Sequence, residues 1–151
     1  MSSKGAATTR IMDQFQELIA GSVLNNERIA RSLGLSVVDW QAFGVIARAK
    51  QSLTAGEISS LTRLPTSTTT RVLDRLEHQG FVNRQADQAD RRRIVIRARP
   101  EVMERFTSDN EDNPYTEIKE SMQDIHSEFT LEELLVVERY LRAVNSGFRS
   151  P

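Results

Sequence analysis

The sequence predicts a mainly α-helical protein with one small β-hairpin, and three observations predict this fold class. Apolar residues recur every three or four positions over most of the chain, which is the spacing of a buried helix face. Two short runs rich in β-branched or apolar residues, 81–85 and 93–99, interrupt that period and flank the polar stretch ADQADRR. The length of 151 residues, with 38% hydrophobic and 27% charged residues, is typical of one globular domain.

Two helical stretches are expected at the start of the chain. Residues 11–24 carry apolar side chains at helical spacing, and residues 26–34 form a second stretch that ends at Gly34, a typical C-cap. The first ten residues have no apolar segment of the kind that a signal peptide needs, so we do not expect a signal peptide. We expect a frayed start there.

Two capping signals divide the next part of the chain. Ser36 and Asp39 form a pair like a capping box, which predicts a buried helix over 37–50. Thr54 and Glu57 form a complete S/T-x-x-E box, which predicts a short helix of about nine residues.

A third central helix and the hairpin follow. Pro65 suits the start of that helix and Gly80 its end. The runs 81–85 and 93–99 then predict a two-stranded hairpin with a charged tip, and Pro100 stops the second strand.

The C-terminal part returns to helical spacing. Apolar residues indicate a helix over 101–106, a break near 108–114 and a helix over 115–129. Thr130 and Glu133 form another capping box before a last helix with a wide apolar face. Such faces at both ends of the chain predict packing against a partner helix.

Charge is distributed unevenly along a chain whose net charge is only −1. Residues 63–99 carry nine arginines and four carboxylates, whereas residues 100–151 carry five basic and twelve acidic side chains. A basic middle followed by an acidic tail indicates an anionic partner for the middle.

The central order of short helix, turn, polar-faced helix and hairpin is typical of a winged helix-turn-helix, in which the hairpin is the wing. The polar-faced helix begins with five hydroxyl residues, which are poor helix formers but fit closely into a DNA major groove. Its candidate DNA-binding residues are Thr66, Ser67, Thr68, Thr69, Thr70, Arg71 and Arg75. The alternative is an ordinary solvated helix face.

The hairpin tip carries three further candidates for DNA contact, Arg91, Arg92 and Arg93. Because side chains alternate along a strand, we expect Arg92 to be free to enter the minor groove and Arg91 to be held by a carboxylate. The candidate ion-pair partners are Asp74, Asp87 and Asp90. The alternative is a charged hairpin tip without a partner.

Several classes of function are not supported by the sequence. The chain has no cysteine, no P-loop and no GxGxxG motif, and His78 and His126 stand alone, without metal-ligand spacing or a neighbouring nucleophile. We therefore expect no enzyme activity, no cofactor and no metal site. No apolar run approaches the roughly 20 residues of a membrane span, so we expect no membrane partner and a cytoplasmic location.

Three segments together resemble the MarR family of transcriptional regulators, and the resemblance extends from about residue 10 to 147. DQADRRR is similar to the D-x-x-D-R-R pattern of the family wing. TSTTTRVLDRLEHQGFVNR resembles the recognition helix and the strand after it, and LTAGEISSLTRL resembles the preceding helix.

The resemblance implies one MarR-like domain, 1–151, that forms a homodimer. It implies dimerisation helices over 10–34 and 100–148 and a winged helix-turn-helix DNA-binding lobe over 36–99. The dimer would bind a palindromic double-stranded operator as a repressor and leave it when a small aromatic ligand binds.

The resemblance also assigns individual residues. The family's wing ion pair would carry over to Arg91 with Asp74 or Asp90. The ligand pocket would involve Phe15, Trp40 and Phe43, although aromatic residues at helical spacing also suit a core.

Two other functions fit the same pattern. A winged helix can dock an acidic protein, in which case it has no affinity for DNA even at low salt. It can also coat DNA without choosing a sequence, which competition with random DNA would detect.

Overall fold

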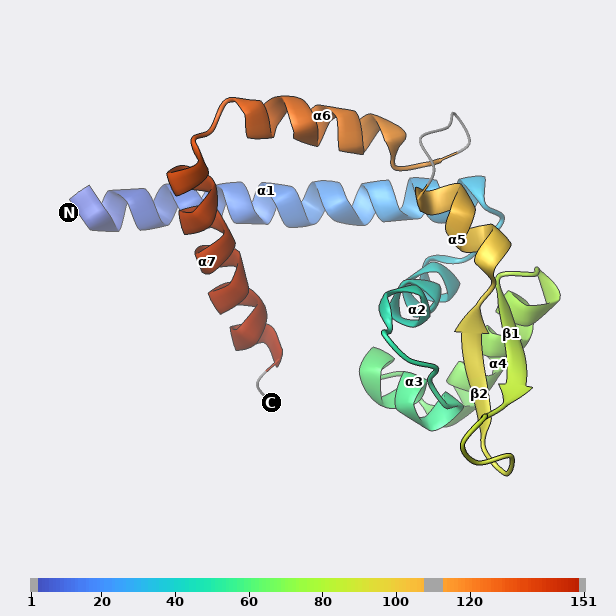
Figure 1. Ribbon diagram of the computed structural model, residues 1–151. Helices are drawn as coiled ribbons and strands as arrows, with labels where there is room; N and C mark the ends of the chain where they lie inside the picture. The colour runs from blue at the N-terminus through green and yellow to red at the C-terminus, as the bar shows by residue number, and fades with distance from the viewer. Residues whose placement is uncertain (1–2, 108–112, 150–151) are drawn as a thin grey trace. The chain divides into compact units, whose positions relative to one another are not determined.

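The computed structural model describes residues 3–107 and 113–149, which are mainly helical with one antiparallel hairpin, as the sequence predicts (Figure 1). Two compact units divide the chain, Met1–Glu104 and Arg105–Pro151. The elements follow in the order α1 (Ser3–Ser32), α2 (Val37–Arg48), α3 (Ala55–Thr62), α4 (Thr66–His78), β1 (Val82–Ala86), β2 (Ile94–Ala98), α5 (Pro100–Thr107), α6 (Thr116–Ser127) and α7 (Leu131–Arg149).

Helix α1 is continuous, whereas the sequence predicted a frayed start and two separate stretches. At the expected break, Asn25 is part of the helix and its Oδ1 accepts from Arg28 at 3.0 Å. The helix ends as predicted before Gly34, which has the left-handed φ of 71° that favours glycine.

The short helix α3 and helix α4 form the predicted helix-turn-helix. Thr54 and Glu57 make the full capping box at the start of α3. Arg63 closes α3 in the left-handed region at φ 57°, and Pro65 is the N-cap of α4. One face of α4 enters the core, and its buried residues are Thr69, Val72, Leu73 and Leu76.

The hairpin pairs β1 with β2 in a register that sets Val82 opposite Ala98 and Ala86 opposite Ile94. Leu53 adds an antiparallel bridge to Ile96 on the free edge of β2. Backbone hydrogen bonds in both directions, at 2.7 and 3.3 Å, attach the hairpin to the segment that precedes α3. These bonds fix the root of the hairpin against the helix-turn-helix.

Aromatic rings link α2 to the start of the hairpin. Trp40 stacks on Phe43 with ring centroids 5.7 Å apart, and Phe43 meets Phe81 edge to face at 5.3 Å. Phe43 is only 1% exposed, and Ile58, Val72, Leu73 and Leu76 are fully buried. The core of the first unit therefore lies beneath α3, α4 and the hairpin and holds them in place.

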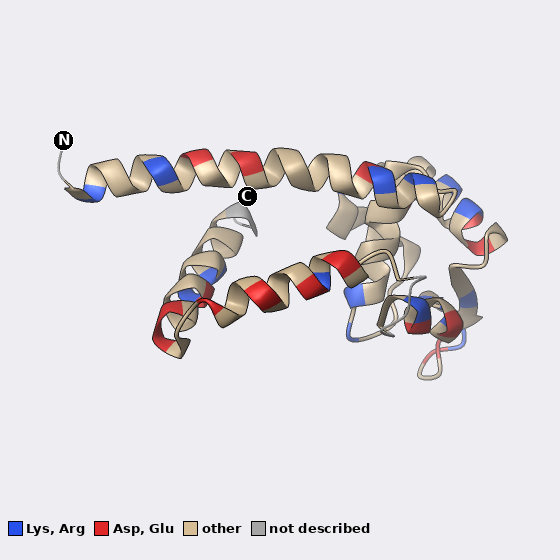
Figure 2. Cartoon of the chain, turned by 90° about the horizontal axis from the view of Figure 1, so that it is seen from above, with Lys and Arg blue, Asp and Glu red and all other residues tan. Residues whose placement is uncertain are grey.

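The second unit contains α6 and α7. The Thr130–Glu133 box that the sequence predicted caps α7, since the Thr130 amide donates to Glu133 Oε2 at 2.8 Å and the Glu133 amide to Thr130 Oγ1 at 3.3 Å. Most of the break expected near 108–114 lies outside the described residues. Acidic residues lie along α6 and in the first turn of α7, so the acidic C-terminal part of the sequence is on these two helices (Figure 2).

Candidate nucleic-acid interface

The face of α4 opposite the core is polar and open to solvent. Thr66, Ser67, Thr70 and Arg71 are exposed along its first turns. Pro65 makes no side-chain cap, so no N-cap side chain covers the first amide groups of α4, which lie at the positive end of the helix dipole. The exposed face adds hydroxyl groups and a guanidinium, which are groups that contact phosphates and base edges.

Thr69 is a correction to the predicted DNA-binding set. Its residue surface is only 1% exposed, so it cannot reach a groove. Its hydroxyl donates to the Pro65 carbonyl at 3.1 Å, which fixes the turn between α3 and α4. The physical reason is its position on the apolar stripe, three residues before Val72 and four before Leu73.

Arg75 makes a contact within the protein that the sequence did not predict. Its guanidinium makes two hydrogen bonds to Asp39 of α2, from Nε to Oδ2 at 3.0 Å and from Nη2 to Oδ1 at 2.6 Å. The Asp39 side chain is 4% exposed and that of Arg75 is 48% exposed. The pair joins α2 to α4, so Arg75 helps to hold α4 in place.

The ionisation of Asp39 follows from this contact. Burial raises the pKa of the Asp39 carboxyl, but hydrogen bonds from Arg75 and Ser36 and the charge of Arg75 lower it further than burial raises it. The net pKa lies below the ordinary value, so Asp39 is a carboxylate at neutral pH.

Asp74 pairs with the root of the hairpin and not with its tip. Arg84 of β1 donates to Asp74 Oδ1 at 2.7 Å and also pairs with Glu77. The Arg84 amide donates to Glu77 Oε1 at 3.3 Å. The predicted pairing of Asp74 with Arg91 is therefore wrong, because Arg84 lies nearer to α4 and occupies this carboxylate.

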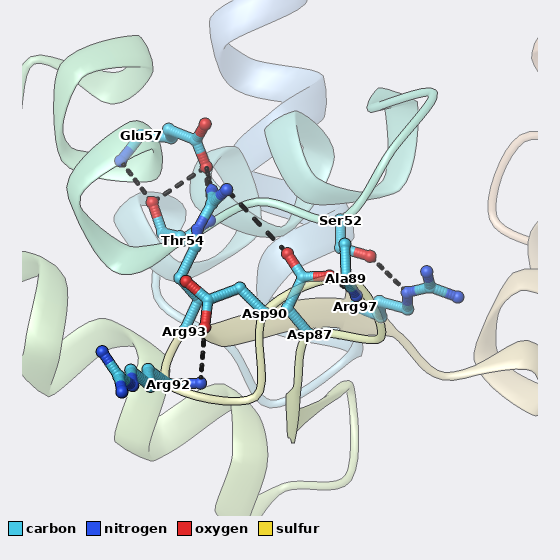
Figure 3. Close-up of polar contacts among 9 residues, drawn as sticks. All are labelled: Ser52, Thr54, Glu57, Asp87, Ala89, Asp90, Arg92, Arg93 and Arg97. Carbon is cyan, nitrogen blue, oxygen red and sulfur yellow. Dashed lines mark hydrogen bonds and ion pairs between the residues drawn. The ribbon is translucent and has the colours of Figure 1, made fainter.

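The wing loop, residues 87–93, is braced by its two aspartates (Figure 3). Asp87 Oδ1 accepts from the Ala89 amide at 2.9 Å, and Asp90 Oδ1 accepts from the Arg92 amide at 3.0 Å. Backbone bonds at 2.9 Å also join Asp87 N to Arg93 O and Arg93 N to Asp90 O. These turns give the loop a defined shape without any apolar core of its own.

Ion pairing separates the three wing arginines. Arg93 lies 3.8 Å from Glu57 and 3.9 Å from Asp87, whereas the structure gives Arg91 and Arg92 no ion pair with any described residue. The expectation that Arg91 is held is thus wrong, since residues 91–93 lie in the turn before β2 and strand alternation does not apply to them. Arg92 is exposed and extends away from the loop, as expected (Figure 3).

The three aromatic residues expected in a ligand pocket lie in two places. Trp40 and Phe43 are core residues, 6% and 1% exposed. Phe15 lies on α1 about 21 Å along the axis from Ile29, where α1 enters the core. There it lines a shallow hollow with Ala7, Arg10, Ile11, Gln14 and Leu18, which all belong to the same helix.

Sequence reasoning missed three positioning residues. Arg84 could have been found, because it is two residues after buried Val82 on β1 and so faces α4 with it. Asp39 and Glu57 were recognised only as parts of helix caps, because nothing in their sequence spacing indicates that they also meet Arg75 and Arg93.

The described residues contain neither a candidate metal site nor a candidate membrane span. Within 3–107 and 113–149, no group of three or more His, Asp or Glu side chains is placed to hold a metal ion. No helix in those ranges is both long and apolar enough to cross a membrane.

Comparison with known proteins gives consistent results. The model of the MarR family matches residues 33–93. The uncharacterized HTH-type transcriptional regulator YcgE of Bacillus subtilis (strain 168) is 33% identical over 123 residues, which cover 82% of this chain and 76% of YcgE.

Solved structures share the fold at lower identity. S. aureus MepR in its DNA-binding conformation superposes with a TM-score of 0.61 at 16% identity, covering 92% of this chain and 98% of that one. A MepR mutant bound to an oligodeoxyribonucleotide gives a TM-score of 0.56 at 19% identity, with the same coverage. Since the family match contains α4 and the wing loop, and the identity to YcgE extends over most of the chain, the protein belongs to the MarR family of winged helix-turn-helix transcriptional regulators.

Proposed function

We propose that the protein is a homodimeric repressor that binds a palindromic double-stranded operator in a sequence-specific way and leaves it when a small aromatic ligand binds. The observation that carries the DNA-binding part is the exposed surface of α4 and the wing. There Thr66, Ser67, Thr70 and Arg71 face solvent, and Arg91 and Arg92 have no ion pair with any described residue.

The chemistry of that surface divides the work between the two grooves. The hydroxyls and Arg71 on α4 are of the right size and polarity for base edges and phosphates of the major groove. Arg91 and Arg92 on the wing match the negative potential of a narrow minor groove. MepR, which has the same fold, has been solved in a DNA-binding conformation, and this supports DNA binding by the fold.

The proposal of a dimer rests on apolar side chains that the described residues leave exposed. Each of α1, α6 and α7 presents such a face to solvent. The exposed residues include Ile11, Leu18, Ile19, Val23 and Leu24 on α1, Met122 and Ile125 on α6, and Leu135, Val136, Val137 and Leu141 on α7. A second copy of the chain would cover these faces and would set two α4 helices about 34–36 Å apart, one turn of DNA.

Release by a ligand requires that the ligand bind one arrangement of the dimer better than the other. The burial of Trp40 and Phe43 makes them poor ligand contacts, whereas the hollow beside Phe15 is open. We therefore propose that the aromatic ligand binds in the hollow beside Phe15 on α1. A thermal-shift screen of aromatic acids, followed by DNA binding in the presence of each hit, tests this part separately.

The test of the main proposal is selection of bound duplexes from random DNA, followed by competition. The expected result is an inverted repeat, bound by a dimer and displaced only by excess of the same sequence. Binding that random DNA displaces equally well would favour a non-specific DNA-coating protein. No binding of double-stranded DNA at low salt would favour a module that docks acidic proteins.

A further inference from the structure

Glu57 connects the start of α3 to the wing. It is the N3 residue of the α3 capping box, and its Oε2 accepts from the Thr54 amide at 2.7 Å and from the Thr54 hydroxyl at 2.8 Å. The same oxygen lies 3.8 Å from Nη2 of Arg93 (Figure 3). The carboxylate therefore caps a helix of the helix-turn-helix and pairs with the wing loop at the same time.

Arg93 is well placed to transmit this contact to the rest of the loop. Its Nη1 lies 3.9 Å from Asp87 Oδ2, at the other end of the loop. Its backbone carbonyl accepts from the Asp87 amide, and its own amide donates to the Asp90 carbonyl, both at 2.9 Å. The position of the Arg93 side chain is thus coupled to the backbone on both sides of Arg91 and Arg92.

We propose that Arg93 is a positioning residue, which ties the wing loop to the α3 capping box through Glu57 and so presents Arg91 and Arg92 to DNA. This role rests on the proposed function, in which the wing enters a minor groove. Arg93 acts here on the protein, whereas Arg91 and Arg92 act on the nucleic acid.

The physical advantage is preorganisation. A hairpin tip without an apolar core keeps some freedom, and removing that freedom on DNA costs conformational entropy. A tie that exists before binding reduces this cost. Glu57 is available as a constant partner, because hydrogen bonds from the Thr54 amide and hydroxyl, with the charge of Arg93, keep its pKa below the ordinary value.

The sign of one substitution separates this role from simple electrostatics. Glu57→Gln keeps the capping box, since glutamine serves at N3 as well, but removes the charge that pairs with Arg93. Loss of a carboxylate near a DNA-binding surface by itself strengthens binding to phosphates. A positioning role predicts the opposite, a weakening of about two- to fivefold, which is the size that an exposed ion pair supplies.

Glu133→Gln is the matched control. Glu133 is the N3 residue of the α7 capping box, with the same pattern of hydrogen bonds from Thr130, and it belongs to a helix outside the helix-turn-helix and the wing. Both variants lose one carboxylate and keep one cap. Thermal unfolding of each, compared with wild type, shows that the folds are equally intact.

The experiment titrates wild type, both glutamine variants, Arg93→Ala and the Glu57→Gln/Arg93→Ala double variant against a labelled duplex recovered by selection. We expect Glu57→Gln to weaken binding and Glu133→Gln to leave it unchanged. We also expect the double variant to bind no more weakly than Arg93→Ala alone, because the two residues act as one pair. Hydrogen exchange of the free protein should show faster exchange of the Arg92 and Arg93 amides in Glu57→Gln and no change in the control Glu133→Gln.

Three results would contradict the proposal, and they can be told apart. Glu57→Gln that binds as tightly as wild type or more tightly would refute the positioning role and leave the proposed function intact. Unchanged exchange of the Arg92 and Arg93 amides in Glu57→Gln would show that the tie does not hold the loop. Failure of the wild-type protein to bind double-stranded DNA at low salt would refute the proposed function, and the positioning role with it.

Discussion

Arg71 and Arg75 lie one turn apart on α4 and should respond in opposite ways to replacement by alanine. Arg75→Ala leaves the Asp39 carboxylate, whose side chain is 4% exposed, without its partner. Removing one member of a fully buried pair costs about 3–5 kcal/mol. The Arg75 side chain is 48% exposed and Ser36 still caps near Asp39, so we expect a smaller loss of about 2 kcal/mol in the free energy of unfolding.

That loss corresponds to a fall in Tm of about 4–8 °C for a chain of this size. Arg71→Ala removes an exposed side chain for which the structure gives no ion pair among the described residues, so the change in stability should stay within about 0.5 kcal/mol. Arg71→Ala should weaken DNA binding by about fivefold or more, because a contact in the major groove is lost. Arg75→Ala should bind DNA within about twofold of wild type at a temperature where both are folded.

The assay is urea denaturation followed by circular dichroism, together with fluorescence anisotropy on one labelled duplex. The reasoning would be refuted if Arg75→Ala kept full stability and lost DNA binding. It would also be refuted if the two variants could not be distinguished in both measurements.

Two further predictions concern stability. The destabilisation of Arg75→Ala should be largest near neutral pH and should shrink as the pH falls below 3.8, the ordinary pKa of Asp39. The reason is that a lowered folded-state pKa gives stability that is present above the ordinary pKa and lost when the carboxylate is protonated. Urea denaturation of wild type and Arg75→Ala from about pH 7 to about pH 3 measures this, and a difference in stability that does not change with pH would contradict it. Leu73 is 0% exposed, so Leu73→Ala should cost about 2–5 kcal/mol in the free energy of unfolding. Leu61 is 60% exposed, so Leu61→Ala should change it by less than about 0.5 kcal/mol. Equal losses in thermal unfolding would contradict the assignment of Leu73 to the core.

Much of the fold could be predicted from the sequence because its signals are local. The Thr54–Glu57 and Thr130–Glu133 boxes mark helix starts with hydrogen bonds between residues three positions apart. The hairpin follows from two β-branched runs around a polar loop. The long α1 differed from expectation, because an interruption in apolar spacing does not by itself end a helix when no helix-breaking residue stands there.

The site was less predictable because its contacts join residues that are distant in sequence. Arg75 and Asp39 are 36 positions apart, and only the packing of α2 on α4 brings them together. Thr69 could have been assigned to the core from its spacing to Val72 and Leu73. It was grouped with the DNA-binding residues because it stands in a run of five hydroxyl residues. The prediction that a carboxylate holds Arg91 was wrong, because side chains alternate in a strand but residues 91–93 form a turn.

The central claim is that the exposed face of α4 and the free wing arginines are the surface that meets DNA. The most direct test measures the salt dependence of affinity for wild type, Arg92→Ala and the control Arg31→Ala, which removes an exposed arginine from α1. We predict a steep slope of log K against log salt that becomes shallower by about 0.9 for each Arg92 removed from the complex, with no change for Arg31→Ala. A slope and an affinity that Arg92→Ala leaves unchanged would contradict the claim.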